Sequence, residues 1–288
     1  MSIDLIAEWN ALVGSLRITR LIAMSCVALS LWIAGPSHAA KPTEVDVELI
    51  LAVDVSRSMT RRELEIQRRG YAEALSSNAV AKVVANGPSG RIALTYFEWG
   101  GTHWQRTIVD WTLIESQQDL KNLAAKLTIE VTQEWRRTSI SGAIDHAMGK
   151  LQDNGYTSLR QIIDVSGDGP NNDGRPVLAA RKAALAKGVI INGLPLMTRE
   201  GIGLQFHLED LDEYYKHCVI GGPGSFIIPV RHWEEFPEAV RRKLVLELAQ
   251  RERLPLRRVA FKWRTANGYD CLVGEKIWQI FRERFPLP

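Results

Sequence analysis

The sequence predicts an α/β fold with a doubly wound, mainly parallel six-stranded sheet and helices on both faces. Two observations indicate this class. Strand-like and helix-like segments alternate along the chain, which is typical of sheets whose crossover connections are helical. The first apolar run, residues 45–53, is rich in Val, Ile and Leu and leads directly into Asp54-Val55-Ser56-Arg57-Ser58, a tight strand-to-helix turn.

Six apolar runs are expected to form the strands. The third is expected to be antiparallel at a sheet edge, because only the brief Gly100-Gly101 loop region separates it from the second. Pro229 places the last run at a sheet edge, since proline cannot donate a ladder hydrogen bond. The predicted strands are 45–53, 92–97, 107–111, 159–166, 189–194 and 225–230.

The segments between these runs have helical periodicity. Residues 61–75 place Leu64, Gln67, Tyr71 and Leu75 on one side of a helix whose opposite side is heavily charged. Gly188 is the residue type that ends a helix in the left-handed conformation. The predicted helices are 61–75, 116–127, 141–151, 175–187, 208–217 and 236–251.

The first 39 residues have the organisation of a secretory signal peptide. Arg17 and Arg20 precede an apolar run at 21–34, and Ser37-His38-Ala39 supplies the small residues of a cleavage site. The run is shorter than the roughly 20 residues of a spanning helix, although an uncleaved anchor is the alternative. We therefore expect export in a bacterium, to the periplasm or outside the cell, with no stable membrane span after cleavage.

Charge and cysteine content restrict the remaining possibilities. The formal net charge of the 288-residue chain is +3 and evenly spread, which argues against nucleic acid or an anionic membrane surface as the partner. After cleavage Cys218 and Cys271 remain. They form either one disulfide or two buried free thiols, because sequence alone does not show whether they meet.

Five oxygen-bearing side chains are predicted to converge on one edge of the sheet. Asp54, Ser56 and Ser58 follow the first strand, Thr138 precedes a helix, and Asp168 follows the fourth strand. Ligands of open α/β sheets collect at the carboxyl ends of strands. Carboxylates and hydroxyls are oxygen ligands of the kind that hard divalent cations such as Mg²⁺ prefer.

More ordinary roles exist for the same residue types. Asp and Ser commonly cap helices, and Asp-Gly is a turn signal, but five matching positions in order are harder to explain as caps. Asp173 is expected to cap a helix rather than bind metal, and Asp164 to be a paired strand residue. Arg57 either pairs with a partner carboxylate or faces solvent, the second being favoured.

The five residues together resemble the metal-ion-dependent adhesion site of the von Willebrand factor A domain. Residues 47–56, 163–172, 191–195 and 218–226 look like a bacterial family of exported, von Willebrand factor A-like proteins carried under a domain-of-unknown-function label. The resemblance covers 45–250. Residues 251–288 lie beyond it, as a basic, aromatic extension that is either a packed appendage or a partner-binding segment.

The resemblance implies that Ser56, Ser58 and Thr138 bind the cation through their hydroxyls, with Asp54 and Asp168 acting directly or through water. The expected cofactor is Mg²⁺ (or Mn²⁺ or Ca²⁺). An open coordination position then accepts a carboxylate from a protein partner whose identity the sequence does not give.

The expected function is therefore a metal-dependent protein-binding module, for adhesion or scaffolding. The alternatives are a metal-dependent hydrolase of the cell envelope and a domain whose metal is purely structural. Haloacid-dehalogenase phosphatases need a second Asp where this chain has Ser56, and no nucleophile elbow, Walker loop or H-E-x-x-H motif occurs. Trp99, Trp104 and Trp135 are expected on loops that border the metal face, as interface anchors, and half-buried packing is the alternative for each.

Overall fold

The computed structural model describes residues 41–127, 137–198, 207–249 and 268–284. The chain divides into two units, 1–41 and 42–288, and the fold described below is that of the second. The predicted signal peptide, residues 1–39, lies outside the described residues. Within the described ranges no helix combines the length and the apolar character needed to cross a bilayer.

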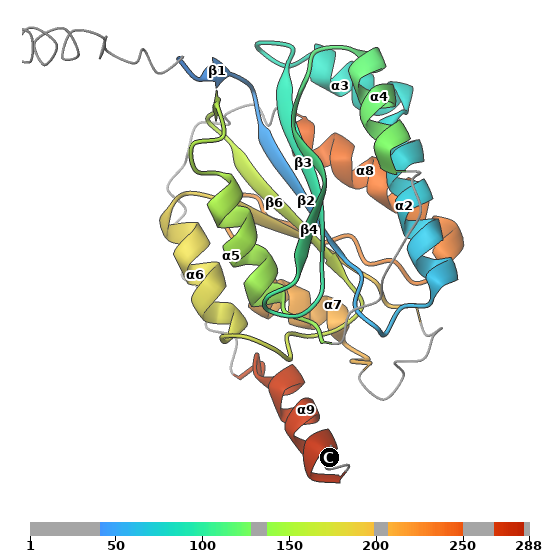
Figure 1. Cartoon of the computed structure of the whole chain (residues 1–288), viewed down its shortest axis with the longest axis vertical. Helices are drawn as coiled ribbons and strands as arrows, with labels where there is room; N and C mark the ends of the chain where they lie inside the picture. The colour runs from blue at the N-terminus through green and yellow to red at the C-terminus, as the bar shows by residue number, and fades with distance from the viewer. Residues whose placement is uncertain (1–40, 128–136, 199–206, 250–267, 285–288) are drawn as a thin grey trace, which may run out of the picture. The chain divides into compact units, whose positions relative to one another are not determined.

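A five-stranded sheet forms the centre of the fold, in the order β4-β3-β2-β6-β7 (Figure 1). Strand β2 pairs in parallel with both β3 and β6, and β7 continues the parallel sheet beyond β6. Strands β3 and β4, which follow β2 in the sequence, lie on one side of β2, and the later strands β6 and β7 lie on its other side. The topology therefore reverses between β2 and β6. The strands are β2 (Glu48–Asp54), β3 (Ile92–Trp99), β4 (Gln105–Ile114), β6 (Gln161–Gly167) and β7 (Ile190–Pro195).

The predicted fold class is confirmed, but the expected count of six strands is wrong. Segment 225–230 makes only isolated parallel bridges, from Ile227 to Gly193 of β7 and from Val230 to Leu196 just after β7. In the register of these bridges, the N–H facing the Ile228 carbonyl would belong to Pro195, which has none. The ladder is therefore interrupted. Strand β4 is antiparallel to β3 at the sheet edge, as expected, and longer than predicted.

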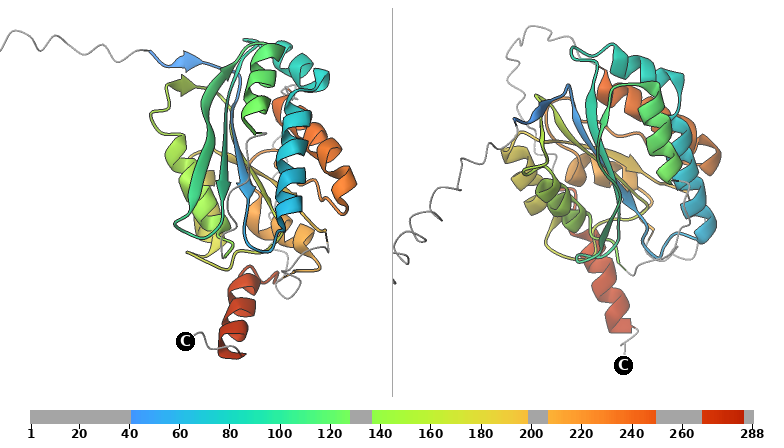
Figure 2. Two further views of the ribbon diagram at one scale, coloured as in Figure 1. Left: turned by 45° about the vertical axis from the view of Figure 1, so that its right-hand side comes forward. Right: turned by 45° about the horizontal axis from the view of Figure 1, so that its top comes forward.

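Helices cover both faces of the sheet (Figures 1 and 2). Side chains of α2, α3, α4 and α8 pack on one face, and those of α5 and α6 on the other. Thr60 and Glu63 form a capping box at the start of α2, which fixes where that helix begins. The helices are α2 (Arg61–Leu75), α3 (Asn78–Ala85), α4 (Gln117–Leu127), α5 (Ile140–Lys150), α6 (Val177–Ala186), α7 (Leu211–Tyr214), α8 (Phe236–Leu248) and α9 (Val273–Arg284).

Shorter elements complete the described chain. A π-helical turn at Tyr215–Val219 continues α7, and a 3₁₀ turn at Trp233–Glu235 precedes α8. Helix α3 was not among the predicted helices. The two-residue strands β1 (Thr43–Glu44) and β5 (Tyr156–Thr157) form a separate parallel pair.

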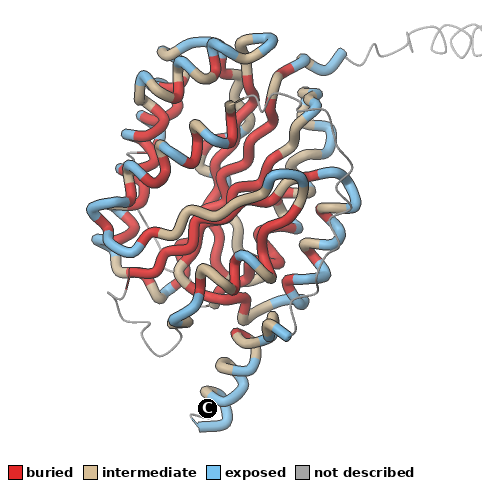
Figure 3. Tube along the Cα trace, turned by 180° about the vertical axis from the view of Figure 1, so that it is seen from behind, coloured by how far each residue is buried: buried red, intermediate tan, exposed pale blue. Residues whose placement is uncertain are grey.

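Strands β2 and β3 are buried along their whole length (Figure 3). Successive side chains of a strand point to opposite faces of the sheet. Accordingly, Leu49, Leu51 and Val53 pack with the α2 side, whereas Ile50 and Ala52 pack with the α5 side. Strand β2 therefore joins two hydrophobic cores, and this rigid centre positions the residue at its carboxyl end, Asp54.

A cluster of charged side chains is buried beside β6. Lys243 Nζ lies 2.6 Å from Asp164 Oδ1 and also bonds Glu247 one helical turn along α8. Asn192 Nδ2 donates to Glu247 Oε1 at 2.9 Å. Asp164 is thus a paired strand residue, as predicted. One ammonium group faces two carboxylates, and burial together with the Glu247 charge raises the pKa of Asp164 to about 7.

This cluster predicts a pH dependence of stability. Between about pH 4, where an unfolded Asp ionises, and about pH 7 the folded chain binds the extra proton. The free energy of unfolding is therefore expected to fall as pH rises through that window. Asp164→Asn should make the fall shallower, as measured by urea denaturation at a series of pH values. The exposed control Asp153→Asn should keep the wild-type slope, and equal slopes for all three proteins would contradict the assignment.

Candidate metal centre

The structure brings all five predicted ligand residues together at the carboxyl edge of β2 and β6. Asp54 ends β2 and accepts the Ser56 N–H at 2.7 Å. Ser58 Oγ lies 3.0 Å from Ser56 Oγ and donates to Asp168 Oδ1 at 2.8 Å. Thr138 Oγ1 donates to Ser56 Oγ at 3.5 Å. Three loops far apart in sequence therefore meet at the point where the sheet topology reverses, where open α/β sheets bind ligands.

Hydrogen bonds to the backbone hold the two serine-bearing loops in place. Gln67 of α2 donates its amide to the Asp54 carbonyl at 2.9 Å. On the second loop, Ser139 N donates to the Gly100 carbonyl at 2.8 Å, and Ser139 Oγ caps α5 by accepting the Gly142 N–H. The residue next to Ser139, Thr138, is thereby fixed at the start of a helix.

The two carboxylates are placed where a cation would stabilise their charge. Asp54 is fully buried, and its Oδ2 has no hydrogen-bond partner among the described residues. Burial, followed by the nearby Asp168 charge, raises the pKa of Asp54 well above its usual range. Burial also raises the pKa of Asp168 to about 6. A dication beside these groups would offset both effects, so the residues present fit a metal.

The composition of the centre favours a hard cation. It combines two carboxylates with three hydroxyls, which are oxygen ligands of the type that Mg²⁺ and Ca²⁺ take. Over the ranges that the structure describes, no three His, Cys, Asp or Glu side chains gather as an alternative metal-binding group. The candidate centre therefore depends on its hydroxyl groups as much as on its charge.

A glycine and a tyrosine that the sequence analysis did not identify line the same space. A Cβ at Gly167 would lie 2.8 Å from Asp54 Oδ2 and 2.9 Å from the Tyr215 hydroxyl, so only glycine fits between them. The Tyr215 hydroxyl is also buried without a hydrogen-bond partner among the described residues. Tyr215 lies in the π-helical turn after α7, and no motif in the sequence connects it to Asp54.

Two further residues, Asn171 and Asn172, hold the Thr138 loop. Asn172 Oδ1 accepts the Thr138 N–H at 3.0 Å, and Asn172 N donates to the Thr138 carbonyl at 2.9 Å. Asn171 Oδ1 accepts the Ser141 N–H at 2.9 Å. The family resemblance includes both residues only as part of the range 163–172, and nothing in that segment alone indicates that they hold Thr138.

Some expectations about the surroundings were wrong. Asp173 does not cap a helix, because its Oδ2 accepts both the N–H and the hydroxyl of Thr102 at 2.8 Å. Trp99 is fully buried at the end of β3, so it does not border an open face. Trp104 is half-buried, which agrees with the packing alternative, and Trp135 lies outside the described residues. Arg57 is exposed, which agrees with the favoured solvent-facing alternative.

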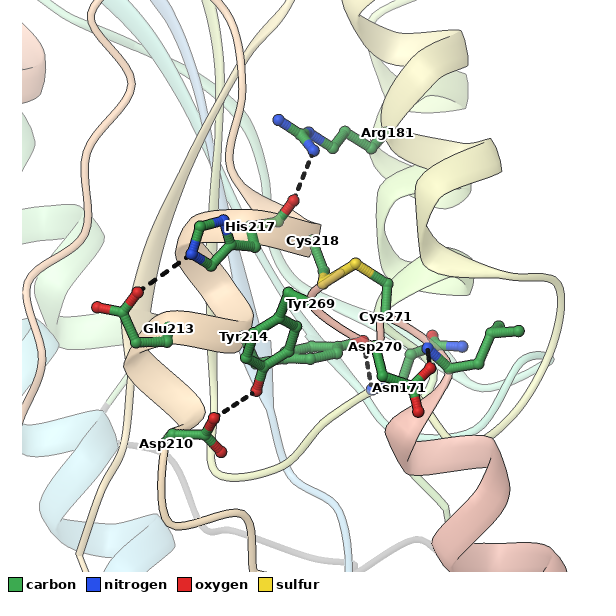
Figure 4. The surroundings of a disulfide bond; sticks show 11 residues. Asn171, Arg181, Asp210, Glu213, Tyr214, His217, Cys218, Tyr269, Asp270 and Cys271 are labelled. Carbon is green, nitrogen blue, oxygen red and sulfur yellow. Dashed lines mark hydrogen bonds and ion pairs between the residues drawn. A yellow bond between two sulfur atoms is a disulfide. The ribbon is translucent and has the colours of Figure 1, made fainter. Parts of the chain in front are cut away.

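Cys218 and Cys271 form a disulfide (Figure 4), which settles the alternative left open by the sequence. Beside it, the Tyr269 ring stacks on His217, and the Tyr269 hydroxyl donates to Asp210 at 3.0 Å. The segment just before α9 is therefore attached to the turn that follows α7. Residues 251–267 and 285–288 of the extension lie outside the described residues.

Solved structures with a similar fold carry von Willebrand factor A-type domains. Proximal thread matrix protein 1 from the mussel byssus, in a structure with a zinc-occupied MIDAS motif, has a TM-score of 0.51 and 15% identity over 73% of this chain and 49% of its own. The pilus adhesin SpaC from Lactobacillus rhamnosus GG has a TM-score of 0.53 and 10% identity over 71% of this chain and 30% of its own. This chain thus spans half or less of each, and such identities show the fold alone.

No curated protein matches the sequence. One family's sequence model does match, over residues 44–252, which is well over half of the chain. The chain therefore belongs to the family described as Protein of unknown function (DUF1194).

Proposed function

We propose that this chain is an exported, metal-dependent protein-binding module. In the proposal the hydroxyls of Ser56, Ser58 and Thr138 hold a dication, Mg²⁺ or alternatively Mn²⁺ or Ca²⁺, with Asp54 and Asp168 acting directly or through water. The observation that carries the proposal is the meeting of three loops around a buried carboxylate oxygen, Asp54 Oδ2, that has no hydrogen-bond partner among the described residues.

The chemistry of this site suits capture of a carboxylate. A bound dication would supply the positive charge that recognises the partner. Asp54 and Asp168 would balance that charge, and the neutral hydroxyls add none, so a coordination position left open on the dication is what would accept a partner's carboxylate. Ser58 and Asp168 are only partly buried, whereas Asp54, Ser56 and Thr138 are buried. The accessible side of the centre is therefore the side of Ser58 and Asp168, where a partner's Asp or Glu would approach.

Two further observations support this function. The fold neighbours include a pilus adhesin and a matrix protein, the latter with zinc in its MIDAS motif. The Cys218–Cys271 disulfide supports export, because disulfides persist mainly in oxidising compartments. The hydrolase alternative has no comparable support among the described residues: the position two after Asp54 is Ser56, whose hydroxyl faces Ser58.

Divalent cation is expected to stabilise the folded chain and to enable partner capture. A ligand at about 100 times its dissociation constant adds roughly 2.7 kcal/mol to the free energy of unfolding. Urea denaturation of the chain from Ala40 onward, in Mg²⁺ and in EDTA, measures this difference. Pull-downs from envelope extract with the same chain should recover a partner in Mg²⁺ and lose it in EDTA.

The variant that combines Asp54→Ala with Asp168→Ala is the control for both measurements. It is expected to show no Mg²⁺-dependent stabilisation and to capture no partner. One outcome would assign the metal a purely structural role. In it Mg²⁺ stabilises the wild type, but the amount of partner captured is the same with EDTA and with the double variant. Absence of any Mg²⁺, Mn²⁺ or Ca²⁺ effect on the wild type would overturn the metal centre itself.

A further inference from the structure

The C-terminal helix α9 contacts both loops that carry the ligands Thr138 and Asp168. Asn171, in the loop after Asp168, donates its amide to Glu275 Oε1 of α9 at 2.9 Å. The guanidinium carbon of Arg137, the residue directly before Thr138, lies 3.8 Å from the centroid of the Trp278 ring. Cation–π contacts at such separations are attractive. Two side chains of α9, one turn apart, therefore reach two separate segments of the candidate centre.

A glycine allows this close approach. A Cβ at Gly274 would lie 2.1 Å from the backbone oxygen of Asn171 and 2.8 Å from its carbonyl carbon. These are backbone atoms, so no flexible side chain can move aside. Gly274 is also buried, whereas most of α9 is not. The first turn of α9 is thus fitted directly against the loop that follows Asp168.

The disulfide fixes where α9 begins. Cys271 lies two residues before the start of α9 and is bonded to Cys218 of the π-helical turn (Figure 4). The residue at the end of α7, Tyr214, accepts the Asn171 N–H on its hydroxyl at 3.1 Å. Asn171 is therefore held from two directions, by α7 through Tyr214 and by α9 through Glu275, and the disulfide ties these two elements to each other.

The contacts continue from Asn171 to the start of α5. Asn171 Oδ1 accepts the Ser141 N–H at 2.9 Å. Its neighbour Asn172 accepts the Thr138 N–H at 3.0 Å and returns a bond from its own N–H to the Thr138 carbonyl at 2.9 Å. A shift of the Asn171–Asn172 segment would therefore move Thr138.

The backbone at Arg137 also needs support. Its φ of 89° lies in a region that an arginine rarely adopts. Such conformations persist only where the surroundings hold them. Here the guanidinium is fixed by the Trp278 ring and by a 3.3 Å hydrogen bond to the Asn172 carbonyl. Trp278 therefore stabilises the strained residue that precedes Thr138.

We propose that α9, anchored by the Cys218–Cys271 disulfide, is a positioning element of the metal centre. Glu275 and Trp278 are its positioning residues, and they act by holding Asn171 and Arg137 so that the Thr138 hydroxyl faces Ser56. This inference rests on the proposed function for its effect on metal binding. The contacts themselves exist without metal, so the positioning can also be tested in the metal-free chain.

The first test uses a steric change outside the ligand set. Gly274→Ala is expected to weaken Mg²⁺ binding by roughly 10-fold, the scale of losses on changing groups that orient metal ligands. The matched control is Gly149→Ala in α5, where an added Cβ meets nothing within 4 Å. Isothermal titration calorimetry with Mg²⁺ alone measures the Mg²⁺ affinity of both variants and of the wild type. Equal affinity for wild type and Gly274→Ala would overturn the proposal.

A second pair of variants separates positioning from general stability. Glu275→Gln keeps an acceptor oxygen for the Asn171 amide and should retain Mg²⁺ affinity, whereas Glu275→Ala should lower it roughly as Gly274→Ala does. The combined change Cys218→Ser and Cys271→Ser removes the disulfide that anchors α9 and should also lower the Mg²⁺ affinity. Wild-type affinity in the double cysteine variant would show that α9 stays in place without the disulfide, which contradicts the anchoring role.

Hydrogen exchange of the metal-free chain provides the independent measurement. The N–H groups of Thr138 and Ser141 bond to Asn172 and Asn171, so they should exchange faster in Gly274→Ala and Glu275→Ala than in wild type or Gly149→Ala. If the wild type binds no divalent cation, the proposed function fails, and exchange alone then decides the positioning role. Unchanged protection of both amides in Gly274→Ala would overturn it.

Discussion

Asp54→Asn is expected to abolish Mg²⁺ binding while leaving the metal-free fold at least as stable as wild type. The loss of affinity should exceed the ~10–100-fold typical of residues that only orient ligands, because this change removes a carboxylate from the centre itself. The remaining carboxylate, Asp168, would leave a bound dication with half the balancing charge. Calorimetric titration with Mg²⁺ measures the effect directly.

The expected stability in EDTA has a separate physical basis. An asparagine Oδ1 still accepts the Ser56 N–H, which Asp54 Oδ1 accepts at 2.7 Å. The other carboxylate oxygen of Asp54 has no hydrogen-bond partner among the described residues, so replacing it removes no described bond. The substitution also removes a buried charge next to Asp168. The metal-free free energy of unfolding should therefore stay level or rise, as urea denaturation in EDTA would show.

Asp145→Asn is the control for this substitution. Asp145 is exposed and pairs with Arg175 rather than with any of the five candidate ligands, so its replacement should change neither Mg²⁺ affinity nor stability by more than about 0.5 kcal/mol. Two outcomes would contradict the assignment: Mg²⁺ affinity of Asp54→Asn within a few-fold of wild type, or a large loss of metal-free stability. The second would indicate that Asp54 has a structural role in the fold.

Lys243→Met is expected to destabilise the chain by about 3–5 kcal/mol, the usual cost of breaking a buried ion pair from one side. Lys243 is 1% exposed and faces Asp164 and Glu247, which are 2% and 1% exposed. Without the ammonium group, two carboxylates remain buried with no cation beside them. Urea denaturation of the variant and the wild type at neutral pH measures the loss.

Two further variants identify the cause. Lys216→Met removes an exposed lysine paired with Glu213 and should cost no more than about 0.5 kcal/mol. Adding Asp164→Asn and Glu247→Gln to Lys243→Met should recover most of the lost stability, because the uncharged amides bring no unpaired charge into the core. If the triple variant is no more stable than Lys243→Met alone, packing of the lysine stem rather than charge accounts for its effect.

The parts of the fold that could be predicted from sequence are those encoded by neighbouring residues. Helix α2 has the predicted bounds, Arg61–Leu75, because its apolar periodicity and the Thr60–Glu63 capping box lie within the segment itself. The ligand candidates were found for a similar reason. Asp54, Ser56 and Ser58 form one local pattern, and general topology places the end of a parallel strand near them.

What sequence could not provide depends on contacts between distant segments. The π-helical turn carries Tyr215 to Gly167, yet nothing near either residue indicates the other. The disulfide stayed undecided because pairing needs a short distance between Cys218 and Cys271, which their spacing along the chain does not give. The sixth strand was overpredicted because β propensity in 225–230 is real, while the missing N–H belongs to Pro195 in another segment.

The polarity of strand β2 determines how the site is presented. The described chain enters the domain through β1 at Thr43–Glu44, ahead of Glu48, whereas the candidate metal centre begins at Asp54, at the far end of the same strand. Seven residues of strand separate these ends by about 20 Å. The ligand-bearing edge and the point where the described chain enters β2 therefore lie at opposite ends of one rigid, buried strand.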